Sequence, residues 1–134
     1  MNPLHFFRHP DLKVEAVDLG NRTVRVPVAR IEGSAPGPTM VVTGGMDGDE
    51  YPGILAAYEL VRRYASDRSA FRGTLVVLPI VNVPGWENES SQNPDDRQFP
   101  KYFYPGKPQG RPTERLVSWL VETHVRGTDA WYDL

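Results

Sequence analysis

Residues 39–50 read TMVVTGGMDGDE, and this stretch decides the fold class of a chain of 134 residues. Its first five residues form a short apolar run, typical of a strand that is buried on both faces. Gly44 and Gly45 follow at once and let the backbone turn tightly. From Tyr51 to Ala65 the apolar side chains recur at helical spacing. The stretch therefore predicts a buried strand, an acidic turn and an amphipathic helix.

The neighbouring segments extend this pattern in both directions. From their periodicity we expect further strands over 12–19, 23–31, 74–81 and 129–134, and a second helix over 113–125. Pro27 lacks a backbone N–H, which favours an edge position for the second of these strands. The order of elements predicts an α/β fold with a mixed, largely parallel sheet flanked by helices, and parallel pairing across each helical crossover.

The last predicted strand stops in mid-element. We therefore expect residues 1–134 to form a single domain that is the front portion of a larger unit. The apolar side chains of 131–134 are expected to leave an exposed strand edge, which favours self-association.

Composition limits the function. The chain has 15 Lys and Arg against 17 Asp and Glu, a net charge of −2, so no positive surplus attracts nucleic acid or an anionic membrane. It contains no Cys, which excludes disulfides and thiolate-bound metals. No run approaches the ~20 apolar residues that span a bilayer. We expect a cytoplasmic protein whose partner is a small molecule, with no nucleic acid and no membrane.

Residues 82–112 form a long connection that has neither helical nor strand periodicity. Six prolines and three glycines lie within it. A connection of this length inside a compact domain is usually functional unless it is disordered. Its five aromatic residues favour a packed loop.

The acidic turn carries the candidate chemistry, with Asp47, Asp49 and Glu50 within four residues. One interpretation is that these carboxylates cap the helix and interact with its dipole. The other is that they hold a divalent cation, since three negative charges in one turn repel one another. Asp47 and Glu50 are three residues apart and would project from one side of the first helical turn if the helix begins near them. They supply two oxygen ligands and need a third from elsewhere.

The histidines contribute less to this chemistry. His5 and His9 are four residues apart, but prolines bracket that segment and argue against a helical ligand pair. His124, in the last turn of the second predicted helix, is expected on the surface near the negative end of the dipole.

Four ordered motifs resemble the succinylglutamate desuccinylase and aspartoacylase family, relatives of the zinc carboxypeptidases. VVTGGMDGDEYPG (41–53) is similar to its first metal motif, a strand followed by G-x-H-G-D-E. GTLVVLPIVNVPGW (73–86) looks like its strand leading into N-P-P-A-F, and YPG (104–106) stands where the family has F-P-G. The ending DAWYDL (129–134) resembles the strand leading to D-L-H. The likeness covers residues 39–134.

This resemblance implies an incomplete zinc carboxypeptidase-like α/β/α sandwich. It also implies a metal-dependent deacylase that cleaves the amide bond of a small acyl-amino-acid-like substrate. Glu50 stands at the family's glutamate ligand, while Asp47 occupies the position of its first histidine ligand. The third ligand would be the histidine directly after Asp-Leu, and the general-base glutamate lies further on, so both are expected beyond Leu134.

Other positions depart from the family pattern. Ser91 and the pair Lys101-Tyr102 stand where the family has the arginine and the Asn-Arg pair that grip the substrate carboxylate. They are the substrate-binding candidates, although only Lys101 supplies a charge. With Asp47 in place of a histidine, the ligand set is more anionic. Zinc is the implied cofactor, and the harder ions manganese and magnesium are the alternatives.

Three functions remain open on the sequence. The first is the family hydrolase, with the isolated 134 residues inactive. The second is a non-catalytic binding or structural module that kept the sheet and lost the site. The third is a half-site subunit that another chain completes.

Overall fold

A computed structural model describes residues 8–134, and residues 1–7 lie outside the described part. Five strands form one mixed sheet in the order β1-β2-β4-β3-β5. The strands are β1 (Leu12–Asp18), β2 (Thr23–Glu32), β3 (Thr39–Thr43), β4 (Thr74–Leu78) and β5 (Ala130–Asp133). The helices are α1 (Tyr51–Ser66), α2 (Val83–Glu87) and α3 (Pro112–Leu120), which continues as a π-helical turn (Val121–Val125). Two 3₁₀ turns are η2 (Arg68–Ala70) and η3 (Pro100–Tyr102).

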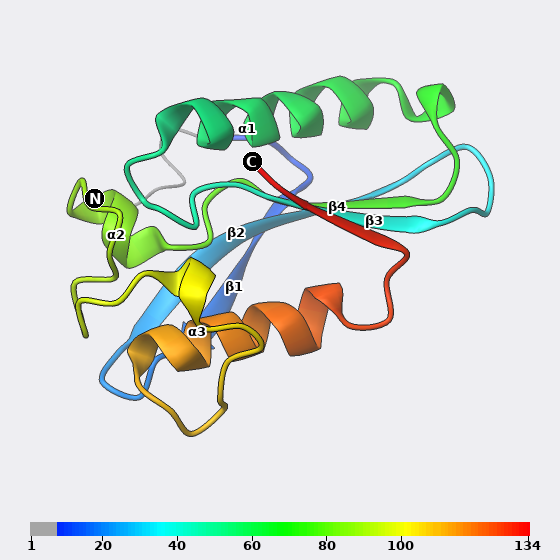
Figure 1. Cartoon of the computed structure of the whole chain (residues 1–134). Coiled ribbons are helices and arrows are strands. Elements are labelled where there is room, and N and C mark those ends of the chain that lie inside the picture. Colours follow the sequence, from blue (N-terminus) through cyan, green and yellow to red (C-terminus); the bar gives the residue numbers. More distant parts are fainter. Residues whose placement is uncertain (1–7) are drawn as a thin grey trace.

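The elements form three layers, with α1 over one face of the sheet and α3 over the other (Figure 1). β3 pairs in parallel with both β4 and β5, while β2 pairs antiparallel with β1 and β4. The predicted α/β fold with a mixed sheet between helices is therefore confirmed, as is parallel pairing across the α1 crossover.

The core lies between the sheet and the two helices. Every residue of β4 is buried, as its unbroken apolar sequence predicts for a strand covered on both faces. Helix α1 buries Ile54, Ala57 and Val61, which recur three or four residues apart on its inner face. Helix α3 buries Leu116 and Leu120 in the same way. Each large apolar side chain that is fully buried stabilises the fold by about 1.5–3 kcal/mol.

The edge position predicted from Pro27 is wrong, since β2 is the second strand of the sheet. The ladder between β2 and β4 covers only Ala29–Glu32, so Pro27 lies beyond it and pairs with Val14 of β1 alone. A residue without an N–H is tolerated there because β4 makes no ladder bond to it.

The strand predicted over 74–81 is shorter in the structure and ends at Leu78, before Pro79. The backbone that follows still bonds to the acidic turn, where the Val81 amide donates to the Gly44 carbonyl at 3.0 Å. The conformation changes here because proline cannot donate to a ladder.

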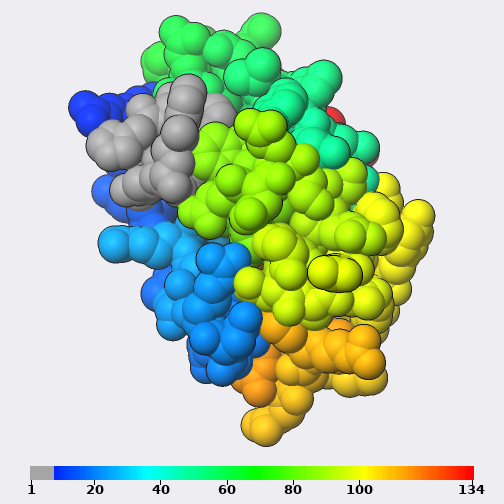
Figure 2. Space-filling model, turned by 90° about the vertical axis from the view of Figure 1, so that its left-hand side faces the viewer, coloured from blue at the N-terminus to red at the C-terminus, as the bar shows by residue number. Residues whose placement is uncertain are grey.

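The long connection over 82–112 is packed, as predicted, but it contains the short helix α2 that its sequence did not indicate. Asn82 caps this helix by accepting a hydrogen bond from the Gly85 amide at 3.0 Å. Figure 2 shows that the connection, light green to yellow, forms a continuous surface between the start of α1 and the start of α3, which is orange. It therefore covers the end of the sheet at which the acidic turn lies.

Candidate active site

The acidic turn joins the carboxyl end of β3 to α1. The Gly44 amide at its start donates to the Leu78 carbonyl at 2.9 Å, which fixes the turn to the end of β4. Gly48 packs directly on α2, since a Cβ atom at this position would lie 2.2 Å from the Trp86 amide nitrogen. Only glycine fits at such a close backbone approach. The turn is thus held rigidly between two strands and α2.

The carboxylates of this turn do not share one helical turn. Helix α1 begins at Tyr51, so Asp47 lies before the helix and Glu50 is the residue that precedes its first turn. Asp47 is buried, with 4% exposure, whereas Asp49 and Glu50 are exposed. The Glu50 side chain makes no capping hydrogen bond to the helix. The capping interpretation therefore does not hold for Glu50.

Asp47 instead pairs with Lys101, which η3 brings from 54 residues further along the chain. The Lys101 ammonium donates a hydrogen bond to Oδ2 of Asp47. This bond raises the pKa of Lys101 above its ordinary value, although partial desolvation opposes it. The other oxygen of Asp47, Oδ1, is buried and has no hydrogen-bond partner. A buried carboxylate oxygen without a partner is costly unless a ligand compensates it.

Asp133, near the end of β5, is a site residue that the sequence analysis missed. Its Oδ1 accepts a hydrogen bond of 2.6 Å from the Thr43 hydroxyl, on the neighbouring strand β3. Burial raises the pKa of Asp133, the Thr43 bond opposes that shift, and the negative charge of Asp47 raises it further. Asp133 thus lies within electrostatic range of the acidic turn. The available signal was its position at the carboxyl end of a predicted parallel strand.

The three substrate-binding candidates have different environments. Lys101 reaches the acidic turn, as described above. The Ser91 hydroxyl donates to the Asp49 carboxylate at 2.8 Å, which holds the start of the loop against the turn. Tyr102 is 74% exposed and packs edge-on against Phe99, with 5.8 Å between the ring centroids.

The two histidines that the structure describes pair with carboxylates outside this cluster. His5 is outside the described residues, and Nδ1 of His9 is 3.7 Å from Oδ2 of Asp11. The surface position expected for His124 is wrong: its side chain is only 10% exposed and its Nε2 is 3.0 Å from Oε2 of Glu15. The π-helical turn at the end of α3 directs it towards β1. Within residues 8–134, no three His, Cys, Asp or Glu side chains are grouped closely enough to hold a metal ion.

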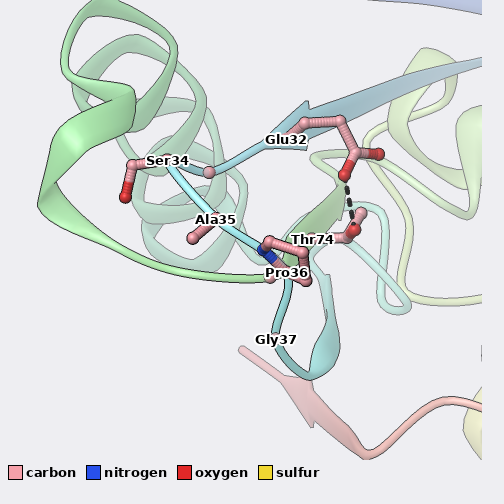
Figure 3. A pocket seen from close by; sticks show the side chains of 8 residues that line it. Glu32, Ser34, Ala35, Pro36, Gly37 and Thr74 are labelled. Carbon is pink, nitrogen blue, oxygen red and sulfur yellow. Dashed lines mark hydrogen bonds between the residues drawn. The ribbon is translucent and has the colours of Figure 1, made fainter.

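A separate hollow of about 540 Å³ lies at the opposite end of the parallel strands, before β3 and β4 begin. Figure 3 shows this hollow, where the Thr74 hydroxyl donates a hydrogen bond of 2.7 Å to the Glu32 carboxylate. Pro36 and Gly37, in the loop between β2 and β3, line it. Sites in open α/β sheets form at the carboxyl ends of the strands. The acidic turn is therefore the candidate active site.

Comparison with known proteins agrees with this architecture. Residues 36–134 match the model of the succinylglutamate desuccinylase/aspartoacylase catalytic domain, and the chain belongs to this family. It is 31% identical over 111 residues to the N-alpha-acetyl-L-2,4-diaminobutyric acid deacetylase of Halomonas elongata, matching 83% of this chain and 32% of that protein. The predicted family membership is confirmed, and the family is one of amide hydrolases.

Solved structures show the same relationship. The succinylglutamate desuccinylase/aspartoacylase of Rhodobacter sphaeroides superposes with a TM-score of 0.78 at 27% identity, over 95% of this chain and 40% of that one. An aspartoacylase family protein of Mesorhizobium loti shares the fold, with a TM-score of 0.82 at 22% identity over 96% and 41% of the two chains. The chain thus spans about a third to two fifths of the length of these relatives. No helix within residues 8–134 has the length and apolar character needed to cross a membrane.

Proposed function

We propose that the whole protein is a metal-dependent amide hydrolase that removes an acyl group from a small acyl-amino-acid-like substrate. Membership of a deacylase family supports the reaction class, as does the relative described as an N-acetyl-diaminobutyrate deacetylase. The observation that carries the proposal is the oxygen Oδ1 of Asp47 in the acidic turn, which is buried and has no hydrogen-bond partner.

Two carboxylates of this turn are available as ligands for a divalent cation. The unpartnered Oδ1 of Asp47 is a carboxylate oxygen with no competing donor, and Glu50 is not engaged in capping α1. Oxygen ligands suit magnesium and manganese best, and zinc also accepts them. In this proposal Asp47 and Glu50 hold the ion, which would polarise the substrate carbonyl and activate a water molecule.

The remaining ligand and the general base would come from outside these 134 residues. The Leu134 amide donates to the Thr43 carbonyl at 2.9 Å, and the Leu134 carbonyl oxygen lies 2.6 Å from where a Gly53 Cβ would be. A residue joined to Leu134 therefore begins beside the first turn of α1 and the acidic turn. We expect the 134 residues alone to be inactive, because residues 8–134 supply only two ligands in this proposal. A second chain that adds the missing groups would restore the site in the same way.

The chain's own residues would bind and orient the substrate. The Ser91 to Tyr104 loop borders the acidic turn, where Ser91 contacts Asp49 and the charged Lys101 contacts Asp47. A single ammonium attracts a substrate carboxylate but cannot grip it in the two-pronged manner of an arginine. The proposed substrate is therefore a small, singly charged acyl-amino-acid-like molecule.

The test is hydrolysis of N-acetyl and N-succinyl amino acids by the whole protein, with and without a chelator, together with its metal content. We expect Asp47→Ala to lower both metal content and activity. Glu59→Ala, on the exposed side of α1, is the control and should change neither. Equal metal content in wild type and Asp47→Ala would remove Asp47 from the ligand set.

A second candidate, a non-catalytic module that binds small molecules, is favoured by the contact between Lys101 and Asp47. An ammonium on the carboxylate compensates the charge of the turn without a metal ion. This candidate replaces the first if the whole protein hydrolyses no acyl-amino acid yet binds one in calorimetry, with equal affinity in the presence of a chelator.

A further inference from the structure

The ammonium of Lys101 is held by a carboxylate and two aromatic rings. It donates a hydrogen bond to Asp47, and its Nζ lies 5.7 Å from the ring centroids of both Phe99 and Tyr102. Aromatic faces attract cations at this distance. The Lys101 side chain is 37% exposed, so the ammonium is held on one side by Asp47 and the two rings and is open to solvent on the other. The loop therefore provides a position for one positive charge and fills it with its own side chain.

This position lies among carboxylates from distant parts of the chain. Asp47 and Glu50 belong to the acidic turn, and the negative charges of both raise the pKa of Lys101. The Lys101 charge in turn opposes the raised pKa of Asp133 on β5. Asp47 is buried, whereas Glu50 and Asp133 are exposed, so the ammonium chiefly offsets the buried negative charge of Asp47.

We propose that Lys101 is a resident cation of the acidic turn, and that a divalent ion binds there only by displacing it from Asp47. The inference rests on the proposed function in one respect, namely that Asp47 can ligate a metal ion. The ammonium occupies Oδ2, while Oδ1 remains buried and without a partner. Removal of the ammonium frees the second oxygen for a bidentate ligand and also removes a positive charge that repels an incoming ion. Lys101 thus lowers the divalent affinity of the site.

The experiment measures Mn²⁺ binding to the metal-stripped whole protein by titration calorimetry. We expect Lys101→Met, which keeps the length of the stem and loses the charge, to bind Mn²⁺ at least tenfold more tightly than wild type. Lys107→Met is the matched control, because Lys107 pairs with Glu114 and is 74% exposed. This control should bind like wild type.

Two further variants identify the cause. The double variant Asp47→Asn with Lys101→Met should lose the gain, because the ligand itself has been neutralised. Lys101→Arg keeps the positive charge and should bind Mn²⁺ as weakly as wild type. If Lys101→Met does not fold, as circular dichroism would show, the comparison of Lys101→Gln with Lys101→Arg replaces it.

The inference is overturned if Lys101→Met binds Mn²⁺ no more tightly than wild type, or if Lys101→Arg gains as much as Lys101→Met. These outcomes are separable from those of the proposed function. If the wild type binds metal and hydrolyses acyl-amino acids, and Lys101→Met has the same Mn²⁺ affinity, the proposed hydrolase stands and the resident cation is rejected. If the wild type is inactive and metal-free, and Lys101→Met binds Mn²⁺, the resident cation stands and the hydrolase is rejected.

Discussion

The indole Nε1 of Trp131 donates a hydrogen bond of 3.0 Å to the hydroxyl of Thr43, which in turn donates to Asp133. A single threonine at the end of β3 thus connects two side chains of β5. This connection determines where the carboxylate of Asp133 lies relative to the acidic turn. It also fastens the outermost strand of the sheet to the strand that leads into the site.

Replacement of Thr43 by valine tests this connection. Valine has nearly the same shape but cannot hydrogen-bond, so two partly buried bonds are lost and the unfolding free energy should fall by about 1–3 kcal/mol. The measurement is urea unfolding of the whole protein. Thr23→Val, at an exposed position of β2, should change stability by less than about 0.5 kcal/mol. Equal effects of the two substitutions would contradict the structural role of Thr43.

Gly48→Ala tests the packing of the acidic turn on α2. The added Cβ would lie 2.2 Å from the Trp86 amide nitrogen, so the turn or the helix must move. We expect Gly48→Ala to destabilise the protein much more than Gly127→Ala does. A Cβ at position 127 meets nothing within 4 Å, so Gly127→Ala is destabilised only by its positive φ of 80°. That backbone strain costs roughly 1–2 kcal/mol. Thermal unfolding of the two variants compares them, and a Gly48→Ala midpoint at or above that of Gly127→Ala would refute the close approach.

Asn82→Asp tests the support of the loop. The Asn82 side chain is fully buried; its oxygen accepts from the Gly85 amide and its Nδ2 donates to the Ser91 carbonyl at 3.2 Å. An aspartate keeps the cap but sets a carboxylate oxygen against that carbonyl, which should cost about 1–3 kcal/mol. Asn21→Asp, at an exposed turn, is the control. Chemical denaturation should show a lower unfolding free energy for Asn82→Asp and not for Asn21→Asp. Equal losses in the two variants would contradict the role of Asn82 in supporting the loop.

Glu114 gives the protein a pH dependence of known sign. The Arg111 amide donates to its carboxylate at 2.9 Å and Lys107 pairs with it at 3.0 Å, which together lower the pKa of Glu114 below its ordinary value of 4.5. Because the folded-state pKa is lowered, the stabilisation is complete above pH 4.5 and is lost as the pH falls through the folded-state pKa. Glu114→Gln should remove this part of the acid dependence, whereas the exposed Glu59→Gln should not. A carboxyl titration of Glu114 by NMR at its ordinary value would disprove the capping contact.

The sequence predicted most of the sheet because local patterns determine it. The apolar runs before Gly44 and after Gly73 became β3 and β4, and helical spacing after Tyr51 became α1. The position of Pro27 could not be predicted, because it depends on how far β4 extends along β2. Ladder length is a property of the assembled sheet and not of either strand alone.

The candidate site was predictable only in part. The acidic turn was visible as a cluster of charges in the sequence, but the partner of Asp47 lies 54 residues away. Contacts at such separations depend on the path of the loop, which has no periodicity to read. Asp133 was missed for the same reason: its relevance arises from the pairing of β5 with β3. Whether Asp47 and Glu50 bind a metal ion stays a prediction.

The cation that accompanies Asp47 is covalently part of the polypeptide. Unlike a metal ion, it cannot be dialysed away, and its local concentration does not depend on the surrounding solution. The acidic turn therefore acquires its counter-charge as soon as the loop that carries Lys101 packs in place. We therefore expect this part of the molecule to fold without a metal ion, and a bound ion to add stability only afterwards.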